Sequence, residues 1–323
     1  MALPGYASLL ERVWHYAYGA ICVAIFIFLI APILIVIPLS FNVEPYFTFT
    51  QKMLSFDPSG YSLRWYDTLL TLGTSAPDGP RDAAWWRQVW HDATWVRAAK
   101  NSLWVGMWAT ILATVLGTVA ALGLSRPEMP YRRVIMAILI SPMIVPIIII
   151  AVGMFFFYSS ACVSPDTAAG QMLAPVLSKK GCLTNSHLGI IMAHATLGIP
   201  FVIITVTATL SGFDQSLIRA GASLGANPTR VFFKVMLPLI LPGVISGGLF
   251  AFVTSFDEVV AVLFIAGPEQ QTIPRQMWNG IREAISPAIL AVATILVIIS
   301  IGLLATVELL RRRSERLRGV SPG

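Results

Sequence analysis

Long runs of apolar residues, separated by polar and charged segments, dominate this sequence. Six of these runs reach the length of about 20 residues that a helix needs to cross the hydrocarbon core of a bilayer. The alternation of apolar and polar positions that a membrane-spanning β-barrel requires is not evident. The pattern therefore predicts an all-α polytopic membrane protein with six transmembrane helices. The predicted spans are 17–39, 102–124, 134–157, 188–210, 240–265 and 287–309.

The composition supports a membrane protein. Of the 323 residues, 56% are hydrophobic and only 12% are charged, whereas a soluble domain has about 25% charged residues. The formal net charge is +6, which a membrane surface explains better than nucleic acid does. No cleavable signal sequence is expected, because the first apolar run is too long and no small-residue cleavage site follows it.

Basic residues are distributed unequally between the two sets of connecting segments. One set, which includes both termini, has twelve basic and five acidic residues in short segments, whereas the other set has ten basic residues in much longer loops. Basic residues close to spans tend to remain in the cytoplasm, so we expect both termini to be cytoplasmic. The twelve residues are Arg12, Arg126, Arg132, Arg133, Arg219, Arg230, Lys234, Arg311, Arg312, Arg313, Arg316 and Arg318.

The first predicted outer loop, 41–101, is the longest loop and is rich in aromatic residues. Within it, 83–99 mixes tryptophans with charged residues, which predicts an amphipathic helix along the outer membrane interface. Two roles remain open for this helix: an aromatic anchor for the second span, or a docking surface for an external partner. The aromatic residues include Trp65, Tyr66, Trp85, Trp86, Trp90 and Trp95.

The second predicted outer loop, 158–187, contains Cys162 and Cys182. The third cysteine, Cys22, lies in the first span and cannot reach them. Two cysteines in a loop that faces an oxidising compartment can form a disulfide, and the sequence leaves both the bonded and the free state open. Two thiols are too few for a metal site, even with His187 nearby.

A helix–turn–helix pattern occupies 211–238, the predicted cytoplasmic connection between the fourth and fifth spans. Asp214 is suited to cap a first helix, which is expected to stop at Gly225, because glycine adopts the left-handed conformation that often follows a helix. Asn227–Pro228 is suited to cap and begin a second helix. This second helix is expected to run through Leu237, to bend at Pro238 and Pro242, and to continue as the fifth span as far as Ile265.

The first of these two helices has a narrow face of small and apolar residues at helical spacing. The second helix, over 228–265, would be about 57 Å long at 1.5 Å per residue, and hydrocarbon is only about 30 Å thick. Its first turns must therefore project into the cytoplasm. We interpret 211–238 as a docking element for a partner rather than as an ordinary amphipathic loop. The narrow face comprises Leu217, Ala220, Gly221 and Leu224.

At these positions the sequence resembles the inner-membrane permease subunits of binding-protein-dependent ABC importers. Their cytoplasmic signature is E-A-A-x3-G-x9-I-x-L-P. Here Arg219–Gly221, Gly225, Val235 and Leu237–Pro238 follow every spacing of that signature, with Arg219 in place of Glu, Gly221 in place of the second Ala and Val235 in place of Ile. The charge at Arg219 is opposite to that of the usual Glu, so the acidic contact of the family is not carried over to this chain.

The resemblance covers most of the chain and is most specific at Ser255–Val260, Thr272–Pro274 and Ser286–Pro287. These segments look like the branch that includes spermidine/putrescine importers and their opine-type relatives. The resemblance implies a type I ABC importer permease, with a single transmembrane domain over 1–323, in the inner (cytoplasmic) membrane of a bacterium. It also implies that 211–238 couples to an ATPase. The expected coupling residues are Leu217, Arg219, Ala220, Gly221, Ser223, Leu224, Gly225, Pro228, Leu237 and Pro238.

The resemblance further implies three partners: an ABC ATPase dimer, a second permease subunit that is usually a different chain, and a soluble substrate-binding protein outside the membrane. The chain lacks the G-x-x-x-x-G-K-[ST] phosphate loop, so it is not expected to be an enzyme or to bind a cofactor. ATP and Mg²⁺ would be used by the ATPase. The expected substrate is a polyamine or a related organic cation, with an opine, a phosphonate or iron as the alternatives.

Two adjacent acids, Asp257 and Glu258, are the only acids well inside a predicted span. An ionised acid at a helix centre costs about 2.5–3.5 kcal/mol, so this pair requires an explanation. Successive helix positions differ by about 100° in direction, so one side chain is expected to face the path and the other a neighbouring helix, a backbone amide or water. Contact with a cationic substrate and a role in a gate or subunit contact both remain open.

Three other features have open or modest interpretations. Trp278, in the outer segment after the fifth span, is either a cation–π face for an ammonium group or an interface tryptophan. His194 is interpreted as a hydrogen-bonded packing histidine. Pro142, Pro146 and Pro200 are expected to bend their helices.

Two other functional classes explain the sequence less well. A secondary transporter or channel needs no ATPase and would leave the spacing of 211–238 without a reason. A membrane-embedded enzyme needs a catalytic or metal-binding constellation, and the chain has no H-E-x-x-H, no G-x-S-x-G and no clustered histidines.

Overall fold

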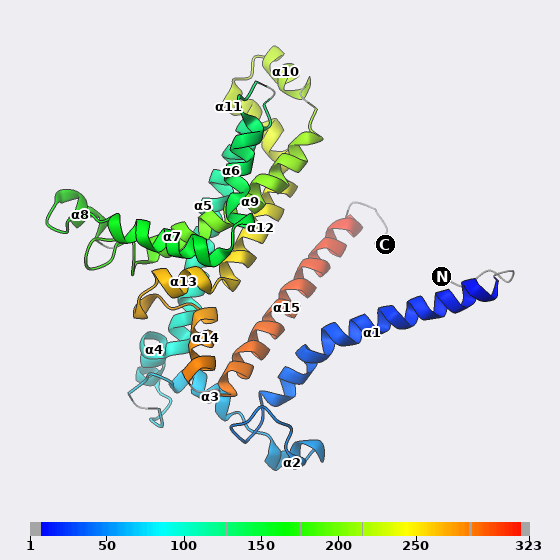
Figure 1. Cartoon of the computed structure of the whole chain (residues 1–323), viewed down its shortest axis with the longest axis vertical. Coiled ribbons are helices and arrows are strands. Elements are labelled where there is room, and N and C mark those ends of the chain that lie inside the picture. The colour runs from blue at the N-terminus through cyan, green and yellow to red at the C-terminus, as the bar shows by residue number, and fades with distance from the viewer. Residues whose placement is uncertain are drawn as a thin grey trace. The chain divides into compact units, whose positions relative to one another are not determined.

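A computed structural model describes residues 8–75, 77–126, 128–174, 176–214, 216–283 and 286–317 (Figure 1). Within these ranges the regular structure is helical, with two isolated β-bridges, which confirms the all-α prediction. Arg318 and Gln215, which the sequence placed in the basic tail and at the start of the first helix of 211–238, lie outside the described residues. The chain divides into two compact units, Met1–Val89 with Gly280–Gly323, and Trp90–Asn279.

The first unit is built around two long helices, one near each end of the chain. The side chains of α1 are mostly exposed in the isolated chain, as expected for a helix that faces lipid or another subunit. The loop after α1 is held to α3, because the Trp65 indole donates to the Asn42 carbonyl at 2.7 Å. The helices are α1 (Leu9–Leu39), α2 (Gln51–Leu54), η1 (Pro58–Gly60), α3 (Arg64–Thr71), α4 (Ala83–Asp92, which crosses the unit boundary) and α15 (Ala288–Leu317).

The second unit contains the rest of the helices. Its connecting segments carry 211–238 and the loop with the two cysteines. The helices are α5 (Thr94–Leu124), α6 (Arg132–Ile144), α7 (Ile147–Ser160), α8 (Ala168–Leu173), α9 (His187–Ser211), α10 (Ser216–Ser223), α11 (Pro228–Val231), the π-helical turn η2 (Phe232–Met236), α12 (Leu237–Asp257), α13 (Val260–Ile265), η3 (Pro268–Gln270) and α14 (Ile273–Glu283, which ends in the first unit).

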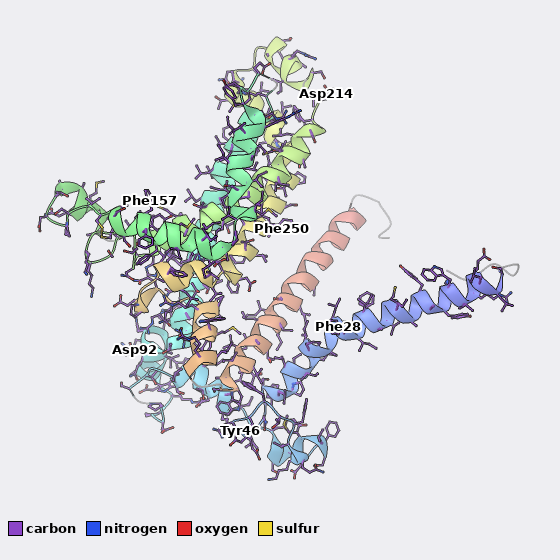
Figure 2. The ribbon with its side chains drawn as sticks, viewed as in Figure 1. Phe28, Tyr46, Asp92, Phe157, Asp214 and Phe250 are labelled. Carbon is purple, nitrogen blue, oxygen red and sulfur yellow. A yellow bond between two sulfur atoms is a disulfide. The ribbon has the colours of Figure 1, made fainter. Side chains whose placement is uncertain are left out.

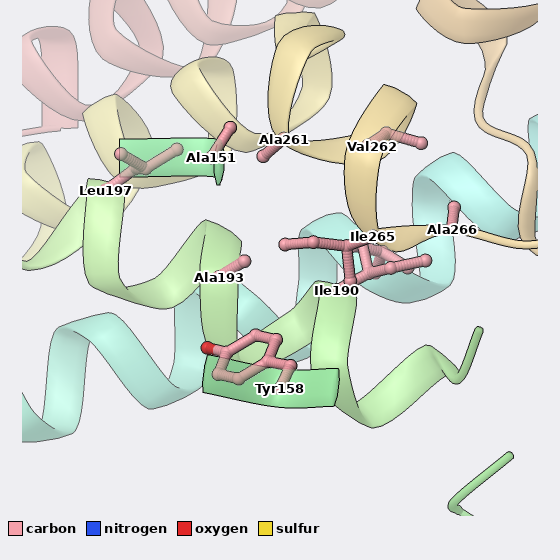
Figure 3. Packing of buried hydrophobic residues seen from close by; sticks show 10 residues of the cluster. Ala151, Tyr158, Ile190, Ala193, Leu197, Ala261, Val262, Ile265 and Ala266 are labelled. Carbon is pink, nitrogen blue, oxygen red and sulfur yellow. The ribbon is translucent and has the colours of Figure 1, made fainter. Parts of the chain in front are cut away.

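Helices α5, α9 and α12 pack side by side and form the centre of the second unit (Figure 1). Small residues allow their backbones to approach closely, as is usual for membrane helices. A Cβ atom at Gly247 of α12 would lie 2.8 Å from the Cα of Val202 on α9, and one at Gly198 would lie 3.0 Å from the Cβ of Ala251. A second buried cluster joins α7, α9 and α13 through residues such as Tyr158, Ile190 and Ile265 (Figure 3).

Four helical stretches in the described residues are long and apolar enough to cross a membrane: Leu9–Leu39, Thr94–Leu124, His187–Ser211 and Pro228–Asp257. Helices α6 and α7 add a fifth if they form one bent span. Helix α15 contributes a shorter apolar stretch, Ala288–Gly302. The predicted fourth span, 188–210, agrees with α9 to within one residue at each end, whereas the count of six remains a prediction.

The predicted third span, 134–157, is not a straight helix. It consists of α6 and α7, which meet at an angle of 103°. The residue before a proline is disfavoured in the helical conformation, and proline has no N–H to donate. Val145 is accordingly extended, with ψ of 138°, in front of Pro146. The expected bend therefore occurs at Pro146, while Pro142 lies inside α6.

The prediction of one continuous helix through 240–265 is wrong. Helix α12 ends at Asp257, Glu258 is extended with φ −73° and ψ 122°, and α13 begins at Val260. The Glu258 carboxylate offers the backbone an alternative to the helical bond by accepting from the Ala261 N–H. The fifth span is therefore a broken helix.

The predicted amphipathic helix 83–99 is also divided. Its first part is α4, which ends at Asp92. Ala93, with ψ of 121°, separates α4 from α5, which begins at Thr94. The second half of the predicted interface helix is therefore the first two turns of the long helix α5.

Candidate functional site

The first helix of 211–238 begins and ends where the sequence predicts. The Asp214 carboxylate accepts from the Ser216 N–H at 2.8 Å and from the Ser216 hydroxyl at 2.7 Å. At the other end Gly225 has a φ of +78°, its N–H donates to the Ala222 carbonyl, and the Ala226 N–H donates to the Gly221 carbonyl. This pair of bonds is the Schellman arrangement that ends a helix at a glycine. Figure 2 labels Asp214 beside α10.

Within 211–238, the charge of Arg219 interacts with the carboxylate of Asp214. Hydrogen bonds from the Ser216 hydroxyl and N–H hold the pKa of Asp214 below its ordinary value, and the charge of Arg219 acts in the same direction. Asp214 is therefore ionised at neutral pH, at the helix end that favours negative charge. Arg219, which stands where the importer signature has Glu, has its acidic neighbour inside the segment itself.

The second helix also has the predicted cap. The Asn227 side chain accepts from the Arg230 N–H at 2.9 Å, and Pro228 occupies the first turn. The helix then passes through the π-helical turn Phe232–Met236 and continues directly into α12. π-helical turns are rare and occur frequently at functional sites. A single helical path therefore leads from Pro228 to Asp257.

The small apolar face of α10 has two different environments. Leu217 and Leu224 are 40% and 88% exposed, and Ala220 is exposed between them. Gly221, which the sequence placed on the same face, instead faces α11, because a Cβ atom there would lie 3.0 Å from a methyl carbon of Val231. The surface available to a partner is therefore Leu217, Ala220 and Leu224, and Gly221 is a contact inside the segment.

The acid pair lies at the break between α12 and α13, and its two members have different surroundings. Glu258 is only 7% exposed, and its Oε1 accepts from the Ala261 N–H at 2.8 Å. Asp257, the last residue of α12, is exposed. The expectation that one acid meets a backbone amide is confirmed for Glu258.

A buried histidine fixes α12 close to this break. His194 of α9 is buried, and its Nδ1 lies 2.8 Å from the hydroxyl oxygen of Ser255, less than one turn before Glu258. The interpretation of His194 as a hydrogen-bonded packing residue is confirmed. Trp278 on α14 is 44% exposed, so its ring is partly accessible.

Sequence reasoning missed the polar residues that hold the segment after the break. The Arg275 guanidinium donates to the carbonyls of Val262 and Ala266. Asn101, about two turns into α5, donates to the carbonyls of Glu269 and Gln271 at 2.8 and 2.9 Å. Asn101 begins Asn101–Leu103, one of the segments that resemble the permeases, but no contact was predicted for it, and Arg275 belongs to no motif. The available signal was a cation and an amide placed next to predicted spans, where buried polar groups need partners.

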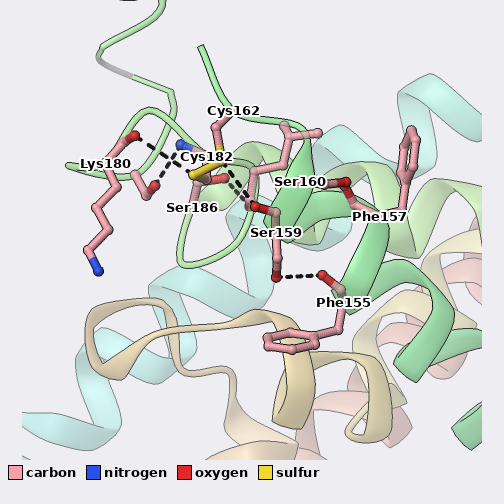
Figure 4. The surroundings of a disulfide bond; sticks show 10 residues. Phe155, Phe157, Ser159, Ser160, Cys162, Lys180, Cys182 and Ser186 are labelled. Atoms are coloured by element: carbon pink, nitrogen blue, oxygen red, sulfur yellow. Dashed lines mark hydrogen bonds between the residues drawn. A yellow bond between two sulfur atoms is a disulfide. The ribbon is translucent and has the colours of Figure 1, made fainter. Parts of the chain in front are cut away.

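The two cysteines of the loop after α7 are bonded to each other. Cys162 and Cys182 form a disulfide with their Cα atoms 4.0 Å apart, beside Ser159 and Lys180 (Figure 4). The bridge closes a loop of sequence separation 20 that contains α8. Cys22, in α1, is free.

Comparison with known proteins gives a family match over most of the second unit and part of the first. Residues 113–316 match the family described as binding-protein-dependent transport system inner membrane component. This region includes α10, the break at Glu258 and Arg275. It therefore includes every part of the candidate site except Asn101.

Curated relatives match almost the whole chain. The spermidine/putrescine transport system permease protein PotC of Haemophilus influenzae is 25% identical over 92% of this chain and 97% of its own. The putrescine transport system permease protein PotI of Escherichia coli is 28% identical over 91% of each chain. A putative 2-aminoethylphosphonate transport system permease protein, PhnU of Salmonella typhimurium, is 28% identical over 71% of this chain and 79% of its own.

A solved structure has a similar fold. It is the crystal structure of a bacterial ABC transporter involved in the import of the acidic polysaccharide alginate, and the match has a TM-score of 0.59 at 16% identity. It covers 96% of this chain and 99% of the other. At this identity the match supports the helical architecture alone.

Proposed function

This chain belongs to the family of inner membrane components of binding-protein-dependent transport systems, and we propose that it is the permease subunit of an ATP-driven importer for a polyamine or a related organic cation. The observation that carries the proposal is the continuous helical path from Pro228 to Asp257, with an exposed docking surface beside its beginning and an exposed acid at its end. The relatives named for spermidine and putrescine transport supply the substrate class.

The proposed mechanism is alternating access driven from outside this chain. An ABC ATPase dimer holds Leu217, Ala220 and Leu224 of α10, and the capped turn at Gly225 connects α10 to the second helix. The stretch Pro228–Asp257 has 30 residues, which corresponds to about 45 Å of helix. When ATP binding brings the ATPases together, displacement of α10 is passed along this helix to the break. ATP and Mg²⁺ act in the ATPase, and no chemical step occurs in this chain.

Asp257 is proposed to contact the cationic substrate. It is the exposed member of the acid pair, whereas Glu258 is buried and its carboxylate accepts a hydrogen bond from the Ala261 N–H. Asp257 also lies at the carboxyl end of α12, where the helix dipole adds negative potential. Trp278 is proposed as a cation–π face along the same route.

Membership of the family supports the remaining partners and the topology that we propose. A second, related permease completes the path, and a soluble binding protein delivers the substrate from outside the inner membrane of a bacterium. We count α6 and α7 as one bent span and α15 as the sixth, in a single permease domain over 1–323. Both termini and α10 are then cytoplasmic. The disulfide supports this orientation, because structural disulfides persist in oxidising compartments.

The orientation predicts how the cysteines react in intact spheroplasts. A membrane-impermeant maleimide should label neither Cys162 nor Cys182 until an impermeant reductant is added outside, after which both should be labelled. The comparison uses a Cys22→Ser background, so that only the loop thiols respond. Labelling that requires membrane permeabilisation would place the loop in the cytoplasm and reverse the proposed topology.

Uptake by the reconstituted complex tests the function. We consider proteoliposomes that contain the permease pair, with the ATPase in the lumen and the soluble binding protein outside. They should accumulate labelled putrescine only when ATP is also in the lumen. Uptake without ATP would favour the secondary transporter. Unlabelled 2-aminoethylphosphonate serves as competitor, because a relative is named for its transport and its ammonium group is shared with putrescine. ATP-dependent uptake of labelled 2-aminoethylphosphonate together with no uptake of putrescine would change the proposed substrate.

A further inference from the structure

The short helix α13 has charged groups of opposite sign at its two ends. At the amino end, the Glu258 carboxylate accepts from the Ala261 N–H at 2.8 Å. At the carboxyl end, the Arg275 guanidinium donates to the Val262 carbonyl at 3.1 Å and to the Ala266 carbonyl at 2.7 Å. An anion at the start of a helix and a cation at its end both complement the helix dipole. Because so short a helix is not stable on its own, these contacts from outside it matter.

Arg275 itself is fixed by contacts between α14 and α5. The Ser102 hydroxyl oxygen accepts from the Ile273 N–H at 2.8 Å, two residues before Arg275. The Asn101 amide holds the preceding connection by donating to the Glu269 and Gln271 carbonyls. The backbone on the amino-terminal side of Arg275 is therefore hydrogen-bonded to α5, which fixes the position from which the guanidinium reaches α13.

The position of α13 determines the position of Asp257. Only Glu258 and Val259 separate Asp257 from the first residue of α13. The face of α13 formed by Ala261, Val262 and Ile265 is buried against α7 and α9, so the short helix cannot rotate without disturbing that packing. The Val262 carbonyl also accepts from the Ala266 N–H, whereas the Ala266 carbonyl accepts from Arg275. If the Ala266 carbonyl lost this donor, its need for another partner would favour a shift of α13, and Asp257 would move with it.

We propose that Arg275 is a positioning residue for transport: by capping the carboxyl end of α13 it maintains the break after α12 and keeps Asp257 exposed to the passing substrate. This inference rests on the proposed function, in which Asp257 meets a cationic substrate. Arg275 has no contact with the substrate in this scheme. Its effect reaches the substrate through α13.

The test compares the assembled importer complex with Arg275→Gln, Arg275→Lys and Arg282→Gln. Arg282 lies on the same helix and is exposed, so its neutralisation is the matched control. Hydrogen–deuterium exchange of the amides of 260–266 should accelerate about tenfold in Arg275→Gln and remain unchanged in Arg282→Gln. Putrescine imported per ATP hydrolysed should fall about tenfold in Arg275→Gln, with the half-saturating concentration within twofold of the wild type. Arg275→Lys retains the charge, so its exchange at 260–266 and its putrescine imported per ATP hydrolysed should both be close to those of the wild type.

Two outcomes would overturn the inference. One is unchanged exchange at 260–266 in Arg275→Gln. The other is an equal loss of ATP hydrolysis and uptake, which would indicate general damage to the complex. If Arg275→Gln does not assemble, Arg275→Lys decides instead: near-normal exchange at 260–266 with near-normal uptake supports capping of α13 by a cation, whereas loss of uptake without faster exchange at 260–266 refutes it. A wild-type complex that imports no putrescine would refute the proposed substrate, while the exchange comparison would still decide whether Arg275 holds α13.

Discussion

Replacing Ala220 with Trp is expected to reduce ATP-driven uptake to less than a tenth of the wild-type rate. Ala220 is exposed between Leu217 and Leu224 on the surface of α10 that we assign to the ATPase. A bulky side chain there prevents close approach of a partner surface, and overpacking a well-fitted contact typically costs about 1–3 kcal/mol. The measurements are uptake by the complex and the amount of ATPase that co-purifies with the permease.

Ala222→Trp is the matched control for this prediction. Ala222 is also exposed on α10, but two helix positions after Ala220 it points about 200° away around the helix axis. We expect Ala222→Trp to retain the ATPase and most of the uptake. Equal loss in both variants would show that α10 does not dock through the Leu217–Leu224 surface. Retention of full uptake by Ala220→Trp would remove the docking assignment.

Gly221 is unsuitable for this test, although it is adjacent to Ala220. A side chain at Gly221 would press on Val231 inside the same chain, so a bulky substitution would separate α10 from α11 before any partner was involved. Loss of uptake in such a variant would report damage to the segment itself. The direction that Gly221 faces depends on a residue ten positions later, and helical spacing alone does not contain that information.

The parts of the site that were predictable from the sequence are those decided by neighbouring residues. Asp214, Gly225 and Asn227 act on amides or backbone angles within a few positions of themselves. Helix caps are local chemistry of this kind. The extent of α9 was predictable as well, because a long apolar run in a membrane protein has few alternatives to a helix.

The break at Glu258 could not be predicted in this way. The stretch from Leu249 to Ala266 contains neither glycine nor proline, so the local pattern predicts an uninterrupted helix. The Glu258 carboxylate accepts from the nearby Ala261 N–H, but the other contacts of α13 come from groups distant in sequence: the Arg275 guanidinium donates to the Ala266 carbonyl, and the Asn185 N–H donates to the Ile265 carbonyl. The angle of 103° between α6 and α7 is a similar case, since Pro146 predicts a bend and tertiary packing decides its size.

Replacing Asp257 with Asn is expected to lower uptake by more than tenfold while leaving the stability of the permease unchanged. Within the part of the chain that the structure describes, the exposed carboxylate has no hydrogen-bond partner, so replacing it with an amide should leave the packing around α12 unchanged. Hydrogen bonds to charged groups contribute about 1.5–3 kcal/mol, and each 1.4 kcal/mol corresponds to about a factor of ten. Uptake of labelled putrescine by the assembled complex and its thermal unfolding midpoint are the two measurements.

Glu258 provides the control, because its two substitutions separate charge from hydrogen bonding. Glu258→Gln keeps an oxygen that can accept from the Ala261 N–H, so we expect near-normal uptake and stability. Glu258→Leu removes the acceptor and should destabilise the complex by about 1 kcal/mol, as loss of a helix cap typically does. If Glu258→Gln abolishes uptake and Asp257→Asn does not, the buried acid would be the one that meets the substrate. The helix break would then have to open during transport to expose it.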